Sequence, residues 1–328
     1  MNFIGIDVSK QKLDCSLIRS NLPNKPLHKT VANTPEGVTS LLAWAANKAH
    51  CEISEFHVIL EATGPYHEIA AESLFEAKCK VSVVNPALTR NFAKSLGYKT
   101  KTDKVDAHVL ARYGLERHAE LQIWTPPAPQ YRQLRILQLR KHALEADLQR
   151  EHNRLEKLQA SRPESFVVES LERMIQHLES ELALLEQAIE THVQAHPKLE
   201  HDRKLLQTIQ GIGHVMSTLL LPVLQPGRFD KAPQVAAYLG VIPVEHQSGT
   251  SVNGRPHLSK AGDATIRAKL YMAAITAVRY NPDVKALYER LLAKGKSKMA
   301  ALGAAMRKLV HICFGVLKTQ TPYTPKVA

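Results

Sequence analysis

Two acidic residues stand at the ends of short apolar runs in the first part of the chain. Asp7 closes the run that begins at Phe3, and Glu61 closes Val58-Ile59-Leu60. A charge in such a place is costly unless a cation meets it, and a metal ion would suffice. Ligand sites of open α/β sheets gather at the ends of strands. We therefore expect the two carboxylates to meet at one end of a sheet.

A second pair of acids lies further along, at Asp103 and Asp106. Their spacing of three puts both carboxylates on one face of a helix. With Asp7 and Glu61 they make a set of hard oxygen donors that suits Mg²⁺, with Mn²⁺ as the alternative. A pair of such ions can stabilise the attacking and the leaving oxygen when a phosphodiester is cut. Lys101 and Lys104, beside the second pair, could hold DNA phosphates.

Each acid also has an ordinary structural interpretation. Asp7 alone is typical of a turn at a strand end, and Asp103 beside Thr102 is typical of a helix N-cap. The combination of two strand-end acids with a D-x-x-D helix in a small α/β domain is more specific than any member. This arrangement resembles the ribonuclease H and Holliday-junction resolvase (RuvC-like) superfamily.

The composition favours a polyanionic partner. Lys plus Arg number 43 against 31 for Asp plus Glu in 328 residues, a formal charge of +12, which leaves DNA, RNA and an anionic membrane surface open as partners.

No apolar run is expected to span a bilayer, because Pro222 breaks the strongest candidate, Val215 to Leu224. The N-terminus does not have the pattern of a signal peptide, so we expect a cytoplasmic, nucleoid-associated protein without a membrane partner. The four cysteines form no C-x-x-C pair, which argues against a disulfide framework or a zinc knuckle.

Three regions follow from the patterning: an α/β domain at 1–125, a helical spacer at 126–195 and a mainly helical domain at 196–328. In the first region, strand-like and helix-like runs alternate around one expected sheet, in the order three strands, helix, strand, helix, strand, helix. The proline-rich stretch from Trp124 to Pro129 should end this domain.

The spacer carries two leucine-rich runs with near-heptad spacing, separated by Ser161-Arg162-Pro163. Such seams predict two helices that pair with each other as a hairpin or with another subunit as a coiled coil. An ordinary core-facing helix pair is the alternative.

The C-terminal region contains two dense motifs. Gly211-Ile212-Gly213 resembles the turn of a helix-hairpin-helix, in which backbone N–H groups at a helix start attract a phosphate regardless of base sequence. A simple tight turn between packed helices is the alternative.

The second motif is the polar, basic stretch from Gln247 to Asp263. Ser248, beside a glycine, could present a mobile hydroxyl, while Arg255, His257 and Lys260 could hold a phosphate or stabilise its charge. A solvated loop whose serines only make turns is the alternative.

The motifs taken together resemble one family over nearly the whole chain. Their order is that of the DEDD transposases of the insertion-sequence-110 family, a group that includes pilin-inverting recombinases. The matching motifs are Gly5-Ile6-Asp7-Val8-Ser9-Lys10, Glu61-Ala62-Thr63-Gly64, Asn85-Pro86-Ala87, Lys101 to Ala107, Gly211-Ile212-Gly213, Ser248-Gly249-Thr250-Ser251 and Ser259-Lys260-Ala261-Gly262.

The resemblance implies a RuvC-like domain, a coiled-coil spacer and a C-terminal transposase domain. It implies that Asp7, Glu61, Asp103 and Asp106 bind Mg²⁺ and that Ser248, rather than Thr250 or Ser251, attacks DNA to form a covalent phosphoserine link. It further implies a structured noncoding guide RNA, the bridge RNA, that pairs with donor and target DNA. Homodimers that assemble into tetramers, with sites shared between subunits, complete the expectation.

The leading hypothesis is therefore RNA-guided DNA recombination by serine attack. One rival is a metal-dependent nuclease or junction resolvase in which activated water attacks. The other is a nucleic-acid-binding protein without enzymatic activity, whose acids are structural.

Overall fold

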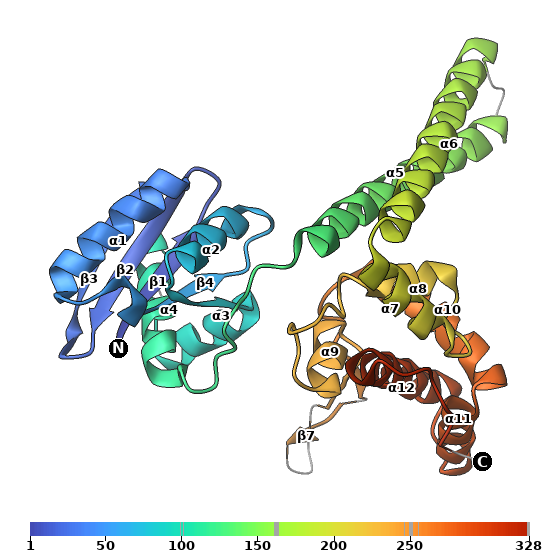
Figure 1. Cartoon of the computed structure of the whole chain (residues 1–328). Helices are drawn as coiled ribbons and strands as arrows, with labels where there is room; N and C mark the ends of the chain where they lie inside the picture. Colours follow the sequence, from blue (N-terminus) through green and yellow to red (C-terminus); the bar gives the residue numbers. More distant parts are fainter. Residues whose placement is uncertain are drawn as a thin grey trace. The chain divides into compact units, whose positions relative to one another are not determined.

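The computed structural model describes residues 1–98, 100, 102–160, 164–245, 247–248, 252–254 and 256–326. The chain divides into two compact units, Met1–Pro126 and Pro127–Ala328. The division falls inside the predicted proline-rich segment. Figure 1 shows the elements of both units.

The N-terminal unit is a sheet with helices on both faces. Its strands are β1 (Asn2–Val8), β2 (Lys12–Arg19), β3 (Leu22–Ala32), β4 (Phe56–Glu61) and β5 (Lys80–Val84). Its helices are α1 (Pro35–Ala49), α2 (Tyr66–Glu76), α3 (Pro86–Ser95) and α4 (Asp103–Arg117), with a 3-10 turn at Ile53–Glu55. The predicted order of strands and helices is confirmed, except that two helices, α3 and α4, follow the last strand in place of one.

The five strands run in the spatial order β3-β2-β1-β4-β5. β1, β2 and β3 form antiparallel pairs, whereas β4 pairs parallel with both β1 and β5. A mixed sheet in this order, with its first three strands as a meander, is the ribonuclease H-like fold that the sequence predicted. The parallel strands β1 and β4 bring their carboxyl ends to the same edge.

The two faces of the sheet carry separate cores. On one face, Ile4, Ile6 and Val8 of β1 pack with the apolar residues of α1 and α2. On the other, Phe3 and Ile59 pack against Leu110 of α4. Successive residues of a strand alternate between faces, so Asp7 and Glu61 belong to the face that α4 covers.

Local sequence explains where these helices begin. The Thr34 side chain accepts a hydrogen bond from the Gly37 N–H, and Pro35 occupies the first turn of α1. Asn85 and Pro86 start α3 in the same way. Thr102 caps α4 by accepting from the Val105 N–H, which leaves Asp103 and Asp106 in the first turn.

The C-terminal unit is mostly helical. Its helices are α5 (Pro129–Gln159), α6 (Ser165–Gln194), α7 (Pro197–Gln207), α8 (His214–Leu220), α9 (Ala232–Tyr238), α10 (Ala264–Tyr280), α11 (Pro282–Ala293) and α12 (Lys298–Thr319). Two short antiparallel pairs join β6 (Pro243–Val244) to β9 (His257–Leu258) and β7 (Gln247–Ser248) to β8 (Val252–Asn253).

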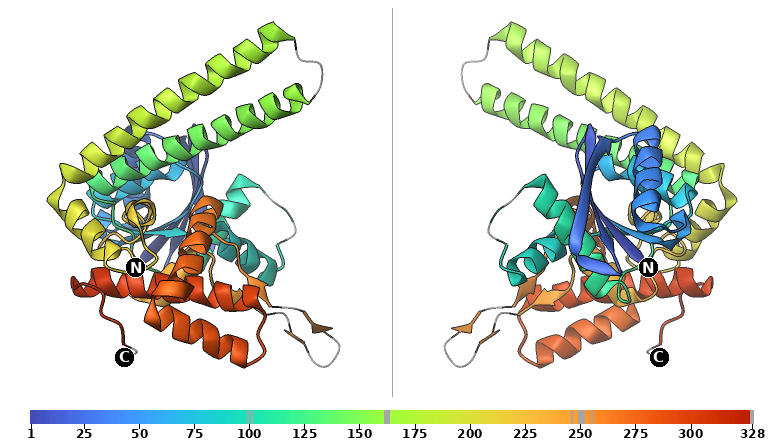
Figure 2. Two further views of the ribbon diagram at one scale, coloured as in Figure 1. Left: turned by 90° about the vertical axis from the view of Figure 1, so that its right-hand side faces the viewer. Right: turned by 90° about the vertical axis from the view of Figure 1, so that its left-hand side faces the viewer.

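Helices α5 and α6 lie side by side as an antiparallel hairpin (Figure 2). The predicted seam faces the partner helix, since Leu144 of α5 and Ile175 and Leu178 of α6 are buried. The hairpin form of the prediction is therefore confirmed within one chain. The base of the hairpin, at Leu134 and Val193, joins the core of the helices that follow.

Helix α12 corrects one expectation of the sequence. We expected no segment able to span a bilayer, yet Lys298–Thr319 is long and apolar enough by length and composition. Its buried residues, among them Met306, Leu309 and Cys313, belong to the core of the helical unit. A core helix passes the same test as a membrane span, and packing explains the apolar face of this one.

Candidate active site

The position of α4 is fixed by two glycines at its contact with the sheet. A Cβ atom on Gly5 of β1 would overlap the Ala107 carbonyl oxygen and the Ala111 nitrogen of α4. A Cβ atom on Gly114 of α4 would overlap the Ile59 side chain of β4. The helix backbone thus lies directly on β1 and β4. Its first turn comes to the strand end at which Asp7 stands.

Electrostatics indicates that the four predicted acids gather at this edge. The pKa of Asp7 is raised from 3.8 to about 6 by desolvation first, and then by the negative charges of Asp106, Asp103, Glu61 and Asp14. Like charges raise a carboxyl pKa in this way only when they are close. The four carboxylates therefore lie at the same edge of the sheet, and their action as one set of ligands stays a prediction.

The acids are held individually by different neighbours. The Thr89 hydroxyl of α3 lies 3.1 Å from Glu61 Oε2, and Lys12 Nζ donates to Asp103 Oδ2 at 2.7 Å. Among the residues that the structure describes, no three Asp, Glu, His or Cys side chains are grouped in a way that could hold one metal ion. The set of four metal ligands that the sequence suggests stays a prediction. Binding one ion would require these carboxylates to turn toward one another.

The donors nevertheless suit a magnesium ion. They are all carboxylate oxygens, the ligand type that hard divalent cations prefer. Desolvation raises the pKa of Asp7 most, and the repulsion from the neighbouring carboxylates that adds to it is of the kind that a cation relieves. The residues present therefore fit the implied metal chemically.

A fifth carboxylate, Asp14 on β2, was missed by sequence reasoning. Asp14 pairs with Asp7 in the register of β1 and β2, and with Thr30 in the register of β2 and β3. It is 7% exposed, accepts a hydrogen bond from Thr30 at 2.7 Å and contacts Lys12 at 2.8 Å. Burial acts to raise the pKa of Asp14, but the bonds from Lys12 and Thr30 prevail, and its pKa is lowered. The sequence did contain a signal that could have revealed Asp14, namely a charged residue between the apolar residues Leu13 and Cys15.

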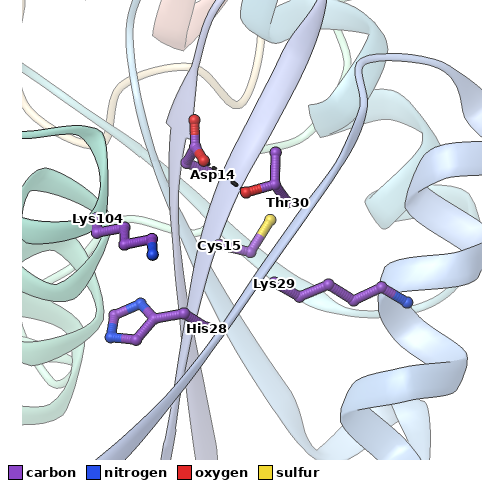
Figure 3. A pocket seen from close by; sticks show the side chains of 6 residues that line it. All are labelled: Asp14, Cys15, His28, Lys29, Thr30 and Lys104. Carbon is purple, nitrogen blue, oxygen red and sulfur yellow. Dashed lines mark hydrogen bonds between the residues drawn. The ribbon is translucent and has the colours of Figure 1, made fainter.

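Lys104 borders a small pocket next to these acids. The pocket has a volume of about 160 Å³ and is lined by Asp14, Cys15, His28, Lys29, Thr30 and Lys104. In Figure 3, Lys104 of α4 and His28 of β3 lie on the Asp14 side of the sheet. Lys29 instead extends to the opposite side, where it donates to Ser40 of α1. Lys104 therefore lines this pocket, and its predicted phosphate contact stays a prediction. Lys101 lies outside the described residues.

The C-terminal candidate stands on a short ribbon. Ser248 ends β7 and pairs with Val252 of β8. The ribbon extends from the helices of its own unit (Figures 1 and 2). Thr250, Ser251 and Arg255 lie outside the described residues, as does the side chain of Ser248.

The segment Ser259 to Gly262 has a structural role at the base of this ribbon. A Cβ atom on Gly240 would overlap the backbone of Ala261, and one on Gly262 would overlap the Tyr238 carbonyl oxygen. Lys260 is exposed, has a φ of +54° and donates its N–H to the Gly240 carbonyl at 3.2 Å. This backbone contact accounts for the two glycines. The predicted phosphate contact of Lys260 stays a prediction.

The predicted helix-hairpin-helix is a turn between α7 and α8. Gly211 has a φ of +101°, and a Cβ atom there would lie 2.7 Å from the Ala277 side chain of α10. Close packing against α10 therefore explains why residue 211 is a glycine. This agrees with the alternative interpretation, a tight turn between packed helices. Gly213 is exposed and precedes α8, a helix of seven residues. Phosphate binding at either glycine stays a prediction.

Comparison with known proteins decides the family. Residues 4–160 match the DEDD transposases of IS110, described as "Transposase", and residues 203–289 match the "Transposase IS116/IS110/IS902 family". The chain belongs to the IS110 family of transposases. As a member of this family it is an enzyme that cuts and rejoins DNA.

Relatives of full length are also found. The chain is 32% identical to the pilin gene-inverting protein of Moraxella bovis, over 99% of this chain and 98% of that protein. It is 33% identical to the pilin gene-inverting protein of Moraxella lacunata over the same shares. A structure of Thermus thermophilus RuvC in complex with a Holliday junction substrate matches 38% of this chain and 99% of that chain, at 16% identity and a TM-score of 0.28.

Proposed function

We propose that this transposase is an RNA-guided DNA recombinase in which Ser248 attacks the DNA backbone and four carboxylates bind Mg²⁺. One observation carries the proposal. Burial, and then the negative charges of Asp106, Asp103 and Glu61 at the same edge of the sheet, raise the pKa of Asp7. Such a cluster has little reason to exist for stability, because like charges repel, whereas it suits a site for a cation.

In this proposal Asp7, Glu61, Asp103 and Asp106 hold Mg²⁺, or Mn²⁺ in its place. When bound, the metal supplies positive charge that stabilises the attacking and leaving oxygens of a phosphodiester. The chain's own part is to keep the carboxylates in place. Thr89 contacts Glu61, and we propose that Lys104 meets a phosphate beside the acids.

The serine step conserves the number of phosphodiester bonds. The Ser248 oxygen forms a bond to phosphorus and loses its proton, while the bond from phosphorus to the leaving sugar oxygen breaks and that oxygen gains a proton. The product is a covalent phosphoserine. A hydroxyl of another DNA end reverses the step, which joins the new strands and frees the serine.

The partners follow from charge and family. DNA is the substrate, and a structured noncoding RNA is proposed as the guide that pairs with donor and target DNA. The formal charge of +12 is consistent with both. The relatives named for inverting a pilin gene support a reaction that rejoins DNA as well as cutting it.

We further propose that homodimers assemble into a tetramer, so that the acids of one subunit act with Ser248 of another. The domain boundaries 1–125, 126–195 and 196–328 belong to the same proposal, as does a location in the bacterial cytoplasm with the nucleoid DNA.

The test is a search for a protein–DNA adduct. The full chain is incubated with Mg²⁺, DNA that carries the element junction and a target, and RNA transcribed from the flanking noncoding region, and is then denatured. We expect an adduct that Ser248→Ala abolishes and that Thr250→Ala and Ser251→Ala retain. Free nicked ends without an adduct would instead identify a metal-dependent nuclease that uses water. If Asp7→Ala or Asp106→Ala leaves strand cutting intact, the metal site is wrong.

Two further arms separate the finer parts of the proposal. Omitting the RNA should abolish joining at the target, and joining without RNA would refute the guide. Mixing Asp7→Asn protein with Ser248→Ala protein should restore the reaction that neither performs alone. If the mixture stays inactive while each variant still assembles with wild-type protein, the shared active site is refuted.

A further inference from the structure

Lys12 contacts the acidic edge directly. Its Nζ lies 2.7 Å from Asp103 Oδ2 and 2.8 Å from Asp14 Oδ2. The contact joins β2 to the first turn of α4 across 91 residues of sequence. Lys12 therefore connects a candidate metal ligand to a carboxylate outside the predicted set of four.

The second carboxylate is an anchor rather than a ligand. The Asp14 side chain is 9% exposed, and its two oxygens are used by different donors: Thr30 at Oδ1 and Lys12 at Oδ2. A buried carboxylate with both oxygens bonded holds its partner in one place. The result is a line of contacts from Thr30 through Asp14 and Lys12 to Asp103.

The backbone of Lys12 is fixed as well. The Ser9 N–H donates to the Lys12 carbonyl at 3.0 Å, and the Ser9 hydroxyl also donates to that carbonyl while accepting from the Lys12 N–H. These bonds close the turn between β1 and β2. Both ends of the Lys12 residue, its backbone and its ammonium group, are thus held.

We propose that Lys12 is a positioning residue that orients the Asp103 carboxylate for the metal, with Asp14 and Thr30 as its support. The Lys12 contact takes Oδ2 of Asp103 and leaves Oδ1 for a cation. Neighbours that orient metal ligands in this way typically change metal affinity about 10- to 100-fold when removed. This inference rests on the proposed metal site.

An exposed ion pair alone would not carry this role. The side chains of Lys12 and Asp103 are 48% and 56% exposed, and exposed pairs contribute little to stability. The buried Asp14 makes the difference, because its Oδ2 lies 2.8 Å from the same ammonium group. We therefore expect Lys12 to affect metal affinity more than folding.

The experiment measures Mn²⁺ binding to the full chain by electron paramagnetic resonance of the free ion, with thermal unfolding as a check on folding. Lys12→Gln should weaken Mn²⁺ binding about 10-fold, whereas Lys12→Arg should stay within about 3-fold of wild type because it restores a cation. Lys10→Gln, an exposed lysine in the same turn, should leave binding unchanged. Thr30→Val removes only the distal support and should weaken binding by less than Lys12→Gln.

The outcomes distinguish the two proposals. Unchanged or tighter Mn²⁺ binding in folded Lys12→Gln would overturn the positioning role, since the ammonium group would then be irrelevant or a competitor. Equal loss in Lys12→Arg and Lys12→Gln would overturn it too. Wild-type protein that binds no Mn²⁺, or that binds it equally after Asp7→Asn, would overturn the metal site itself and this inference with it.

Discussion

Gly5 of β1 and Ala107 of α4 are in direct backbone contact, close enough that a Cβ atom on Gly5 would overlap the Ala107 carbonyl oxygen. Asp7 follows Gly5 by two residues on the same face of the strand. Asp106 precedes Ala107 in the helix. This single contact therefore sets how closely the acids of the strand and of the helix approach each other.

The first prediction concerns this contact. Gly5→Ala must push α4 away from β1, and overpacking of this kind costs about 1–3 kcal/mol. Mn²⁺ binding and DNA cleavage should fall further than the loss of stability alone explains, because Asp103 and Asp106 move with the helix. The free energy of unfolding and Mn²⁺ affinity are measured on the same samples.

Gly315→Ala provides the matched control for Gly5→Ala. Gly315 lies within α12, and an added Cβ atom there meets nothing within 4 Å. Replacement of a helical glycine by alanine should stabilise the protein by up to about 1 kcal/mol. A Gly5→Ala protein with wild-type Mn²⁺ affinity would show that α4 does not position the acids.

The acids at the strand ends could be predicted because their signal is local. Asp7 and Glu61 each interrupt an apolar run, and the spacing of Asp103 and Asp106 follows from helix geometry alone. The start of α4 is equally local, although Thr102 rather than Asp103 is its N-cap. These features need no knowledge of which strands are neighbours.

The supporting residues could not be predicted in the same way. The contact of Lys12 with Asp103 spans 91 residues, and that of Thr89 with Glu61 spans 28. Both depend on strand order and register, which tertiary packing decides. Helix α12 shows the same limit, because its apolar composition has the same pattern whether the face meets lipid or a protein core.

The second prediction concerns pH. The pKa of Asp7 rises from 3.8 to about 6 on folding, so the folded state binds the proton more tightly than the unfolded state. The stability that this proton provides is fully present below pH 3.8 and is lost as pH rises through about 6. Without metal, Asp7→Asn should therefore unfold at a higher temperature than wild type above pH 6, and the advantage should shrink on acidification.

Metal should reverse the order of the two proteins. Mg²⁺ that binds only the folded wild type raises its stability by mass action, while Asp7→Asn should gain little. Thermal unfolding with EDTA or Mg²⁺ across this pH range checks both statements, with exposed Asp230→Asn of the other unit as the control. A lower unfolding temperature for Asp7→Asn at neutral pH without metal would contradict the repulsion argument.

The third prediction concerns the hairpin of α5 and α6. Leu144 is 3% exposed and Leu139 of the same helix is 51% exposed. Leu144→Ala should lower the free energy of unfolding by about 2–5 kcal/mol because it opens a cavity in the seam, and Leu139→Ala should be nearly neutral. Urea unfolding at two protein concentrations provides the measurement.

The same pair of variants tests the proposed assembly. An intrachain seam makes the effect of Leu144→Ala independent of protein concentration. If Leu139→Ala instead costs as much as Leu144→Ala, and more at high protein concentration, the outer face of α5 is covered by a second subunit. That result would place a dimer contact on the outer face of α5.

The fourth prediction concerns the base of the ribbon that carries Ser248. Gly240 has a φ of +69°, and a Cβ atom there would also overlap the Ala261 backbone, whereas Gly295 has a φ of +74° with open space around it. Gly295→Ala should cost only the backbone strain, about 1–3 kcal/mol. Gly240→Ala bears the same strain and must also separate Gly240 from Ala261, which displaces the strand pair β6–β9 next to the ribbon. The denaturing adduct assay is run with equal amounts of folded protein. We expect Gly240→Ala to reduce the yield of the Ser248 adduct at least 10-fold more than Gly295→Ala does. Equal adduct yields from the two variants would show that the base of the ribbon does not position the serine.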